Sequence, residues 1–154
     1  MSLGVMTMSG CVVPPNITEA PPPPNEPPVI LRDDVIPEPG GSVTVCPDEL
    51  LFVHIPVSDA NVTDTLTLRL FVDDAPVHTG PGTQEETIRT FDAGLDGPCS
   101  RVTMPTGMPT GLLEAIVSDR GFIAGGRDTP AGAGTASLVW QLMCPPACQL
   151  DGGG

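Results

Sequence analysis

One segment of the sequence, residues 65–72, constrains the fold most, because its side chains alternate strictly between two kinds. Leu66, Leu68, Leu70 and Val72 share one face of an extended chain, and Thr65, Thr67, Arg69 and Phe71 share the other. A period of two is typical of a β-strand with one buried face and one face in water. We therefore expect this segment in an antiparallel sheet that is covered on one side.

Similar short segments recur along the chain, and proline and glycine separate them. The 154 residues include 20 Pro and 18 Gly, a content that argues against a helical protein. Further strands are expected at Val29–Leu31, Ser42–Cys46, Leu50–Val57, Thr87–Phe91, Arg101–Met104, Leu112–Ser118 and Ser137–Met143. Leu113, Ala115, Val117, Leu138, Trp140 and Leu142 are expected to face the core. Such a series predicts an all-β, antiparallel β-sandwich of seven or eight strands with Greek-key connections, on the order of 120 residues long.

Two short motifs add a resemblance to known domains. Asn25–Ile30 is similar to the start of bacterial Ig-like and cadherin-like repeats, and Ile116–Phe122 resembles the penultimate strand and exit turn of extracellular Ig-like domains. The chain has no Tyr, so it departs from the usual tyrosine corner of that fold. The resemblance implies one Ig-like module over residues 28–148, followed by a flexible tail at 149–154.

The N-terminal motif Met8-Ser9-Gly10-Cys11 resembles the lipobox of bacterial lipoproteins. Ser9 and Gly10 fit that motif, whereas Met8 stands where Leu is usual, and no Lys or Arg precedes the short apolar run. The resemblance implies that residues 1–10 are part of a signal peptide and that Cys11 carries lipid. Val12 is not the Asp of an inner-membrane retention signal, which points to the outer membrane or the cell surface. The alternative is an ordinary N-terminus with a chance Ser-Gly-Cys.

A proline-rich linker follows Cys11. Residues 11–27 include Pro14, Pro15, Pro27 and the run Pro21–Pro24. Such a segment forms neither helix nor sheet and adopts polyproline II conformations. We interpret it as a disordered spacer between the lipidated cysteine and the sandwich.

The five cysteines support export. With Cys11 set aside, Cys46, Cys99, Cys144 and Cys148 form an even set, which predicts two disulfides in an oxidising compartment. In Ig-like folds the second half of the first strand runs parallel beside the last strand, which favours Cys46–Cys144 with Cys99–Cys148. The rival pairing is Cys46–Cys99 with Cys144–Cys148. A zinc site made by the same four cysteines is a third, less favoured interpretation.

Few residues of the sequence are candidates for catalysis or metal binding. His54 and His78 have no nucleophile motif around them, so we expect a protein that is not an enzyme. No cofactor is expected, with calcium as the one candidate. Asp59, Asp64, Asp73 and Asp74 flank the strands and could supply oxygen ligands, although acidic turns are usually only solvated.

The formal net charge of −13 disfavours binding to nucleic acid or to anionic lipid headgroups. Attachment to a membrane is then expected through a covalent lipid or a partner, and not through a basic patch. The function that we expect is a non-catalytic, lipid-anchored module of the cell envelope that binds a protein partner through the loop Gly121–Ala136 or a sheet edge. The alternatives are a subunit of a larger envelope assembly, with Phe71 turned toward a partner, and a calcium-dependent adhesion module.

Overall fold

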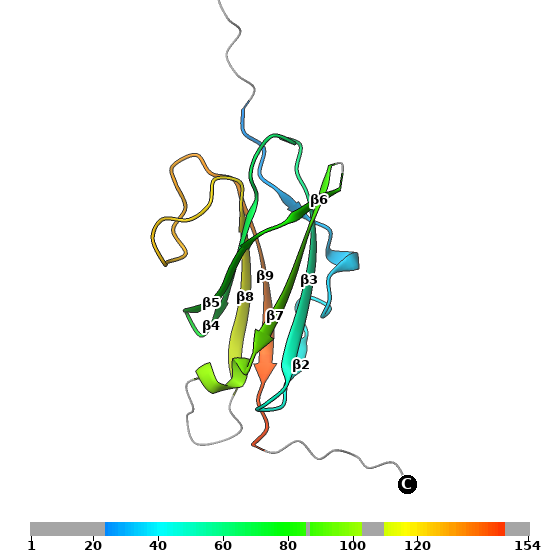
Figure 1. Cartoon of the computed structure of the whole chain (residues 1–154), viewed down its shortest axis with the longest axis vertical. Coiled ribbons are helices and arrows are strands. Elements are labelled where there is room, and N and C mark those ends of the chain that lie inside the picture. The colour runs from blue at the N-terminus through cyan, green and yellow to red at the C-terminus, as the bar shows by residue number, and fades with distance from the viewer. Residues whose placement is uncertain (1–23, 86, 103–109, 147–154) are drawn as a thin grey trace, which may run out of the picture.

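The computed structural model describes residues 24–85, 87–102 and 110–146, which form two packed β-sheets (Figure 1). The strands are β1 (Val29–Ile30), β2 (Ser42–Thr44), β3 (Leu50–Ser58), β4 (Thr67–Val72), β5 (Ala75–Pro81), β6 (Thr83–Glu85), β7 (Ile88–Asp96), β8 (Thr110–Ser118) and β9 (Thr135–Met143). Two short 3-10 helices, η1 (Arg32–Asp34) and η2 (Pro98–Arg101), complete the described elements. The prediction of an all-β sandwich is confirmed.

The strand order is that of an Ig-like sandwich. One sheet has the order β1-β3-β7-β6 and the other has the order β2-β9-β8-β4-β5. Among the described strands the chain changes sheet at the connections β1–β2, β2–β3, β3–β4, β5–β6 and β7–β8. The crossings from β3 to β4 and from β7 to β8 give the Greek-key connectivity. Among the strands that the structure describes, all pairs are antiparallel except β2 and β9, where Ser42 lies opposite Gln141 in a parallel pair. The expected position of the first strand's second half, parallel beside the last strand, is therefore confirmed.

The core is aliphatic and is made by the facing sides of the two sheets. The residues of β8 and β9 that were expected to face inward, namely Leu113, Ala115, Val117, Leu138, Trp140 and Leu142, are all buried. Leu51, Val53, Ile55 and Val57 of β3 meet them from the other sheet. The indole nitrogen of Trp140 donates a hydrogen bond of 2.9 Å to the carbonyl oxygen of Pro37, so its polar atom is satisfied in the core.

Four elements differ from the sequence prediction. Strands β5 and β6 were not expected as separate strands, and β7 continues beyond Phe91 to Asp96. Arg101 was expected in a strand but belongs to the 3-10 helix η2, which begins with Pro98. Proline has no amide hydrogen and a fixed φ, so it favours the first turn of a helix over a ladder position.

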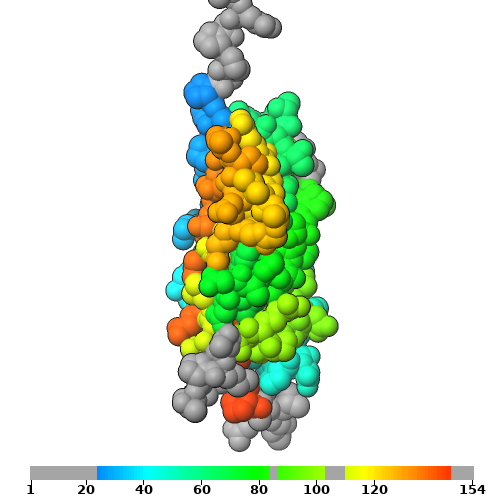
Figure 2. Space-filling model, turned by 90° about the vertical axis from the view of Figure 1, so that its left-hand side faces the viewer, coloured from blue at the N-terminus to red at the C-terminus, as the bar shows by residue number. Residues whose placement is uncertain are grey.

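The prediction of a solvated outer face on β4 is wrong. Arg69 and Phe71 are 9% and 1% exposed. The reason is the long connection between β8 and β9, residues 119–134, which folds back over β4 and β5. Figure 2 shows this segment in yellow and orange, lying on the surface above the green strands.

The two ends of the sandwich differ in what they carry. The first described segment enters at one end, and β9 ends at the opposite end (Figure 1). We call the end where the chain enters the N-terminal pole. The chain therefore traverses the long axis of the sandwich between its first and last described residues.

Candidate functional site

Two buried carboxylates meet at the N-terminal pole. Strands β3 and β8 end at Ser58 and Ser118, and the next residue of each is an aspartate. Asp59 and Asp119 are 3% and 4% exposed, and each lies close enough to repel the other electrostatically. The fold thus brings together two Ser-Asp pairs that are 60 residues apart in the sequence, by the arithmetic 119 − 59.

Amide groups connect these carboxylates to the segment where the chain enters. The side-chain nitrogen of Asn25 donates a short hydrogen bond to the Asp119 carboxylate. The side-chain nitrogen of Asn61 donates to Oδ1 of Asn25 at 2.8 Å, and the backbone amide of Asn61 donates to Oδ1 of Asp59 at 2.8 Å. We call Asn25, Asp59, Asn61, Asp64 and Asp119 the pole cluster.

In the pole cluster, the surroundings of Asp59 disfavour the ionised form of its carboxyl. Burial raises the pKa of its carboxyl above the usual value of 3.8, and repulsion by Asp64 and Asp119 raises it further. The hydrogen bond from the Asn61 backbone and attraction to Arg89 act in the opposite direction. Its Oδ2 atom is buried, and within the described part of the chain it has no hydrogen-bond partner.

Asp119, by contrast, is well supported. Both of its carboxylate oxygens accept from the backbone amide of Gly134 at 2.9 Å. A side chain at position 134 would clash, since an added Cβ would lie 2.7 Å from Oδ2 of Asp119 and 2.6 Å from Cα of Pro27. Glycine at this position is therefore what allows the backbone to approach the carboxylate and the entering chain together.

The four calcium candidates do not form one site. Asp59 and Asp64 belong to the pole cluster, whereas Asp73 and Asp74 form the turn between β4 and β5 with φ of 45° and 72°. Oδ1 of Asp73 accepts from the amide of Leu112 at 2.8 Å, and Asp74 pairs with Arg127. Within residues 24–85, 87–102 and 110–146, no three His, Cys, Asp or Glu side chains form a group that could hold a metal ion by themselves.

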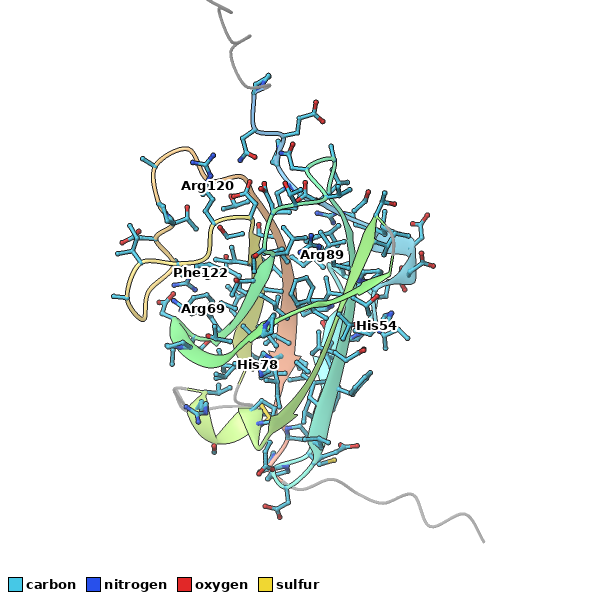
Figure 3. All side chains as sticks on the ribbon, turned by 45° about the horizontal axis from the view of Figure 1, so that its top comes forward. His54, Arg69, His78, Arg89, Arg120 and Phe122 are labelled. Carbon is cyan, nitrogen blue, oxygen red and sulfur yellow. A yellow bond between two sulfur atoms is a disulfide. The ribbon has the colours of Figure 1, made fainter. Side chains whose placement is uncertain are left out.

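Two arginines fix the 119–134 loop to the sandwich. Arg69 donates from Nη1 to the carbonyl oxygens of Ala124 at 3.1 Å and Gly126 at 2.6 Å, and its guanidinium lies over Phe122 (Figure 3). Its Nε donates to Thr79 of β5 at 3.0 Å. These bonds satisfy a nearly buried guanidinium and hold the loop at two of its carbonyls.

The second arginine, Arg127, extends from the loop onto the strands. Its Nε donates to the Glu114 carboxylate at 2.7 Å, and Nη1 pairs with Asp74. These bonds raise the pKa of the Arg127 guanidinium, with the Glu114 hydrogen bond as the main cause. The same guanidinium lies 4.7 Å from the centroid of Phe71. Phe71 is therefore covered, and the expectation that it faces a partner is wrong.

One disulfide corrects both predicted pairings. Cys99 is bonded to Cys144, with an S–S distance of 1.99 Å and a Cα–Cα distance of 5.6 Å. The favoured Cys46–Cys144 with Cys99–Cys148 and the rival Cys46–Cys99 with Cys144–Cys148 are both wrong. The zinc interpretation fails with them, because two of its four sulfurs are bonded to each other. Helix η2 instead places Cys99 beside the residue that follows β2, where its Sγ lies 3.3 Å from the carbonyl oxygen of Val45.

The two histidines lie on different sheets and do not share a site. His54 of β3 contacts Asp92 of β7 at 2.6 Å on the outer face of its sheet, whereas His78 is on β5 (Figure 3). The lipobox-like residues Met8–Cys11, the linker up to residue 23, Cys148 and the tail at 149–154 lie outside the described residues. The described residues contain no helix long and apolar enough to cross a membrane.

Sequence reasoning found Asp59 and Asp64 but missed the residues that complete the pole cluster. The sequence indicated Asn25 only as part of a domain start, and Asp119 only as part of the exit turn within Ile116–Phe122. The repeated Ser-Asp at the ends of two apolar strands was the available signal. No protein-family model matches this chain, and no match was found among curated proteins.

Proposed function

We propose that this protein is a non-catalytic β-sandwich module of the bacterial cell envelope, held at the outer membrane or the cell surface by lipid on Cys11. The observation that carries the proposal is the Cys99–Cys144 disulfide, which joins residues 45 positions apart within the core. Disulfides of this kind persist in oxidising compartments and are rare in the cytosol. The disulfide thus supports export, and Met8-Ser9-Gly10-Cys11 supplies the lipoprotein interpretation.

The way in which the chain enters the sandwich fits such a tether. Asn25 is bonded to Asp119 and Asn61 at the N-terminal pole, so a pull on the preceding residues would be transmitted to the ends of β3 and β8. The opposite end carries the disulfide and the end of β9 (Figure 1). In this arrangement the N-terminal pole of the sandwich faces the membrane, and its sides and opposite end are accessible to a ligand.

Fractionation of the producing cells tests this proposal. The full chain should sediment with outer-membrane or surface fractions, and a Cys11→Ser variant should be released in soluble form. Cys46→Ser is the matched control, because it changes a cysteine of the sandwich and leaves the lipobox-like motif intact. Equal release of the wild-type chain and the Cys11→Ser variant would contradict a lipid anchor.

A second candidate function, a subunit of a larger envelope assembly, is favoured by exposed apolar residues on the outer face of β3. Leu50 and Phe52 are 60% and 51% exposed and lie on the same face as His54. Ile36 bridges to His54 from the neighbouring segment and is also exposed. Three large apolar side chains on one sheet face are suited to a protein contact.

A photo-crosslinker placed at position 52 tests this second function in intact cells. It should capture a discrete envelope protein, whereas a crosslinker at position 139, which is exposed on the other sheet, should not. Capture from both positions alike, or from neither, would count against a specific contact at β3.

A further inference from the structure

The hydrogen bonds of the pole cluster join three segments, namely the entering chain (residues 24–28), the β3–β4 connection and the 119–134 loop. The backbone amide of Asn61 donates to Oδ1 of Asp59, and the Asn61 side chain donates to Oδ1 of Asn25 and to the carbonyl oxygen of Glu26. The Asn25 side chain in turn donates to the Asp119 carboxylate. Asn61 therefore connects the surroundings of Asp59 directly to the entering chain.

One atom of the Asp59 carboxyl is left without a bond. The residue is 3% exposed, its Oδ1 accepts from Asn61, and its Oδ2 is buried without a hydrogen-bond partner among the described residues. An ionised carboxylate in this position loses its hydration, and no bond to Oδ2 offsets that loss. A bound proton removes the charge and makes the carboxyl a hydrogen-bond donor.

The charges that act on Asp59 come from three different segments. Asp64 of the β3–β4 connection and Asp119 of the 119–134 loop repel its negative charge, whereas Arg89 of β7 attracts it. The Arg89 guanidinium also donates from Nη2 to a backbone carbonyl oxygen at 2.8 Å. The exposed charged residues that flank the pole on the entering chain and the loop are Glu26 and Arg120. Burial and the two carboxylates outweigh the cation, so the pKa of the Asp59 carboxyl is raised above 3.8.

We propose that the N-terminal pole is a proton-controlled latch: protonated Asp59 holds the entering chain on the sandwich, and ionised Asp59 allows it to detach. Ionisation places a third negative charge beside Asp64 and Asp119. An outward movement of the β3–β4 connection would hydrate Oδ2 and separate the carboxylates. The same movement breaks the bond between Asn61 and Asn25, because both bonds belong to one residue of that connection.

Proton linkage gives the direction of the effect. The closed pole binds the Asp59 proton more tightly than an open, hydrated pole does, so the stability that the proton supplies is complete below pH 3.8 and is lost as pH rises through the raised pKa. For the lipid-anchored protein, opening would add residues 25–28 to the spacer, or about 12 Å of extended chain. This consequence rests on the proposed anchor, whereas the latch itself does not.

Hydrogen exchange of the oxidised full chain, followed by NMR at pH 4 and at pH 7, tests the latch. After correction for intrinsic exchange rates, protection of the Asn61 backbone amide and the Asn25 side-chain amide should be about threefold or more higher at pH 4. In the Asp59→Asn variant both amides should be well protected at both pH values. Asp33→Asn, at an exposed position of η1, is the matched control and should keep the pH dependence.

A titration of the wild-type chain keeps the latch testable if the Asp59→Asn variant fails to fold. The carboxyl carbon of Asp59 and the side-chain amide of Asn25 should titrate with the same midpoint, above pH 3.8. A midpoint of Asp59 at or below 3.8, an Asn25 amide that does not follow it, or an unchanged pH dependence in Asp59→Asn would each overturn the latch. None of these measurements depends on lipid at Cys11, so failure of the latch is distinguishable from failure of the anchor.

Discussion

The guanidinium carbon of Arg69 lies 4.5 Å from the centroid of the Phe122 ring, and this contact joins β4 to the loop that follows β8. Arg69 lies on the outer face of its strand and Phe122 lies within residues 119–134. The contact explains why a face with the alternation of a solvated strand is covered. It also makes the loop a fixed part of the sandwich surface.

Replacement of Arg69 by Ala should free this loop. The change removes two hydrogen bonds to loop carbonyls and the contact with Phe122, so we expect a loss of about 1–3 kcal/mol in the free energy of unfolding. Hydrogen exchange should become faster across residues 119–134. Arg32→Ala, at an exposed position of η1, is the matched control. Unchanged exchange in the Arg69 variant would show that the loop is held by other contacts.

Replacement of Asp59 by Asn should stabilise the folded protein at neutral pH. Burial raises the pKa of Asp59 above 3.8, so the folded protein binds this proton more tightly than the unfolded chain does. The stability that this proton supplies is complete below pH 3.8 and is lost as pH rises through the raised folded-state pKa. The variant keeps Oδ1 as an acceptor for Asn61 and removes the buried charge, which should gain about 1 kcal/mol or more at pH 7.

Urea unfolding at pH 7 and at pH 4 measures this difference in the free energy of unfolding. The advantage of the Asp59→Asn variant should be largest at pH 7 and should shrink at pH 4, where the wild-type carboxyl is more protonated. Asp33→Asn, at an exposed position of η1, controls for a general loss of negative charge. A variant that is less stable than the wild type at pH 7 would show that the fold accommodates the ionised Asp59 well.

Removal of the Cys99–Cys144 disulfide should destabilise the sandwich strongly. The two cysteines are 45 residues apart, and loop-closure entropy for such a separation corresponds to about 4 kcal/mol. The double variant Cys99→Ala, Cys144→Ala tests this by urea unfolding against the oxidised wild type. A loss well below 1 kcal/mol would mean that the disulfide contributes little to the fold.

The same double variant identifies the partner of Cys46, which is also disulfide-bonded. We expect Cys148, because β2 runs parallel beside β9 and Cys148 follows Cys144 by four residues. Non-reducing tryptic mapping should then link the peptide 33–69 to the peptide 128–154. A link from 33–69 to the peptide that contains Cys11 would contradict both this pairing and the lipid anchor.

The single tryptophan reports on the core. Trp140 is 0% exposed, so its emission should be blue-shifted in the folded protein and resistant to quenching by iodide. Both properties should be lost together on unfolding in urea. A red-shifted emission that iodide quenches in buffer would contradict the packing of β9 against the opposite sheet.

The sequence predicted the two-sheet fold and the inward faces of its long strands, but not the loop that covers β4. Alternation placed Leu113, Ala115 and Val117 inside correctly, because the period of a strand determines which side chains share a face. It could not show that Arg69 would be buried, because burial there depends on a loop that lies 50 or more residues further along the chain. The disulfide was missed for a related reason, since strand ends were considered and the position of helix η2 was not.

The pole cluster shows the same limit in another form. The sequence identified Asp59 and Asp64 as carboxylates near strand ends. Their neighbours in the pole cluster include Asn25 and Asp119, which are distant in the sequence. Asp73 and Asp74 looked equivalent in the sequence and are instead occupied by Leu112 and Arg127. A local sequence pattern identifies carboxylate side chains near strand ends, whereas the topology of the sheets determines which of these side chains lie close together.

The mass of the intact protein, extracted with detergent from the membranes of the producing cells, tests the central claim most directly. The account predicts a chain that begins at Cys11 and carries the added mass of acyl chains, with residues 1–10 removed. A chain that retains Met1 and an unmodified Cys11 would contradict it.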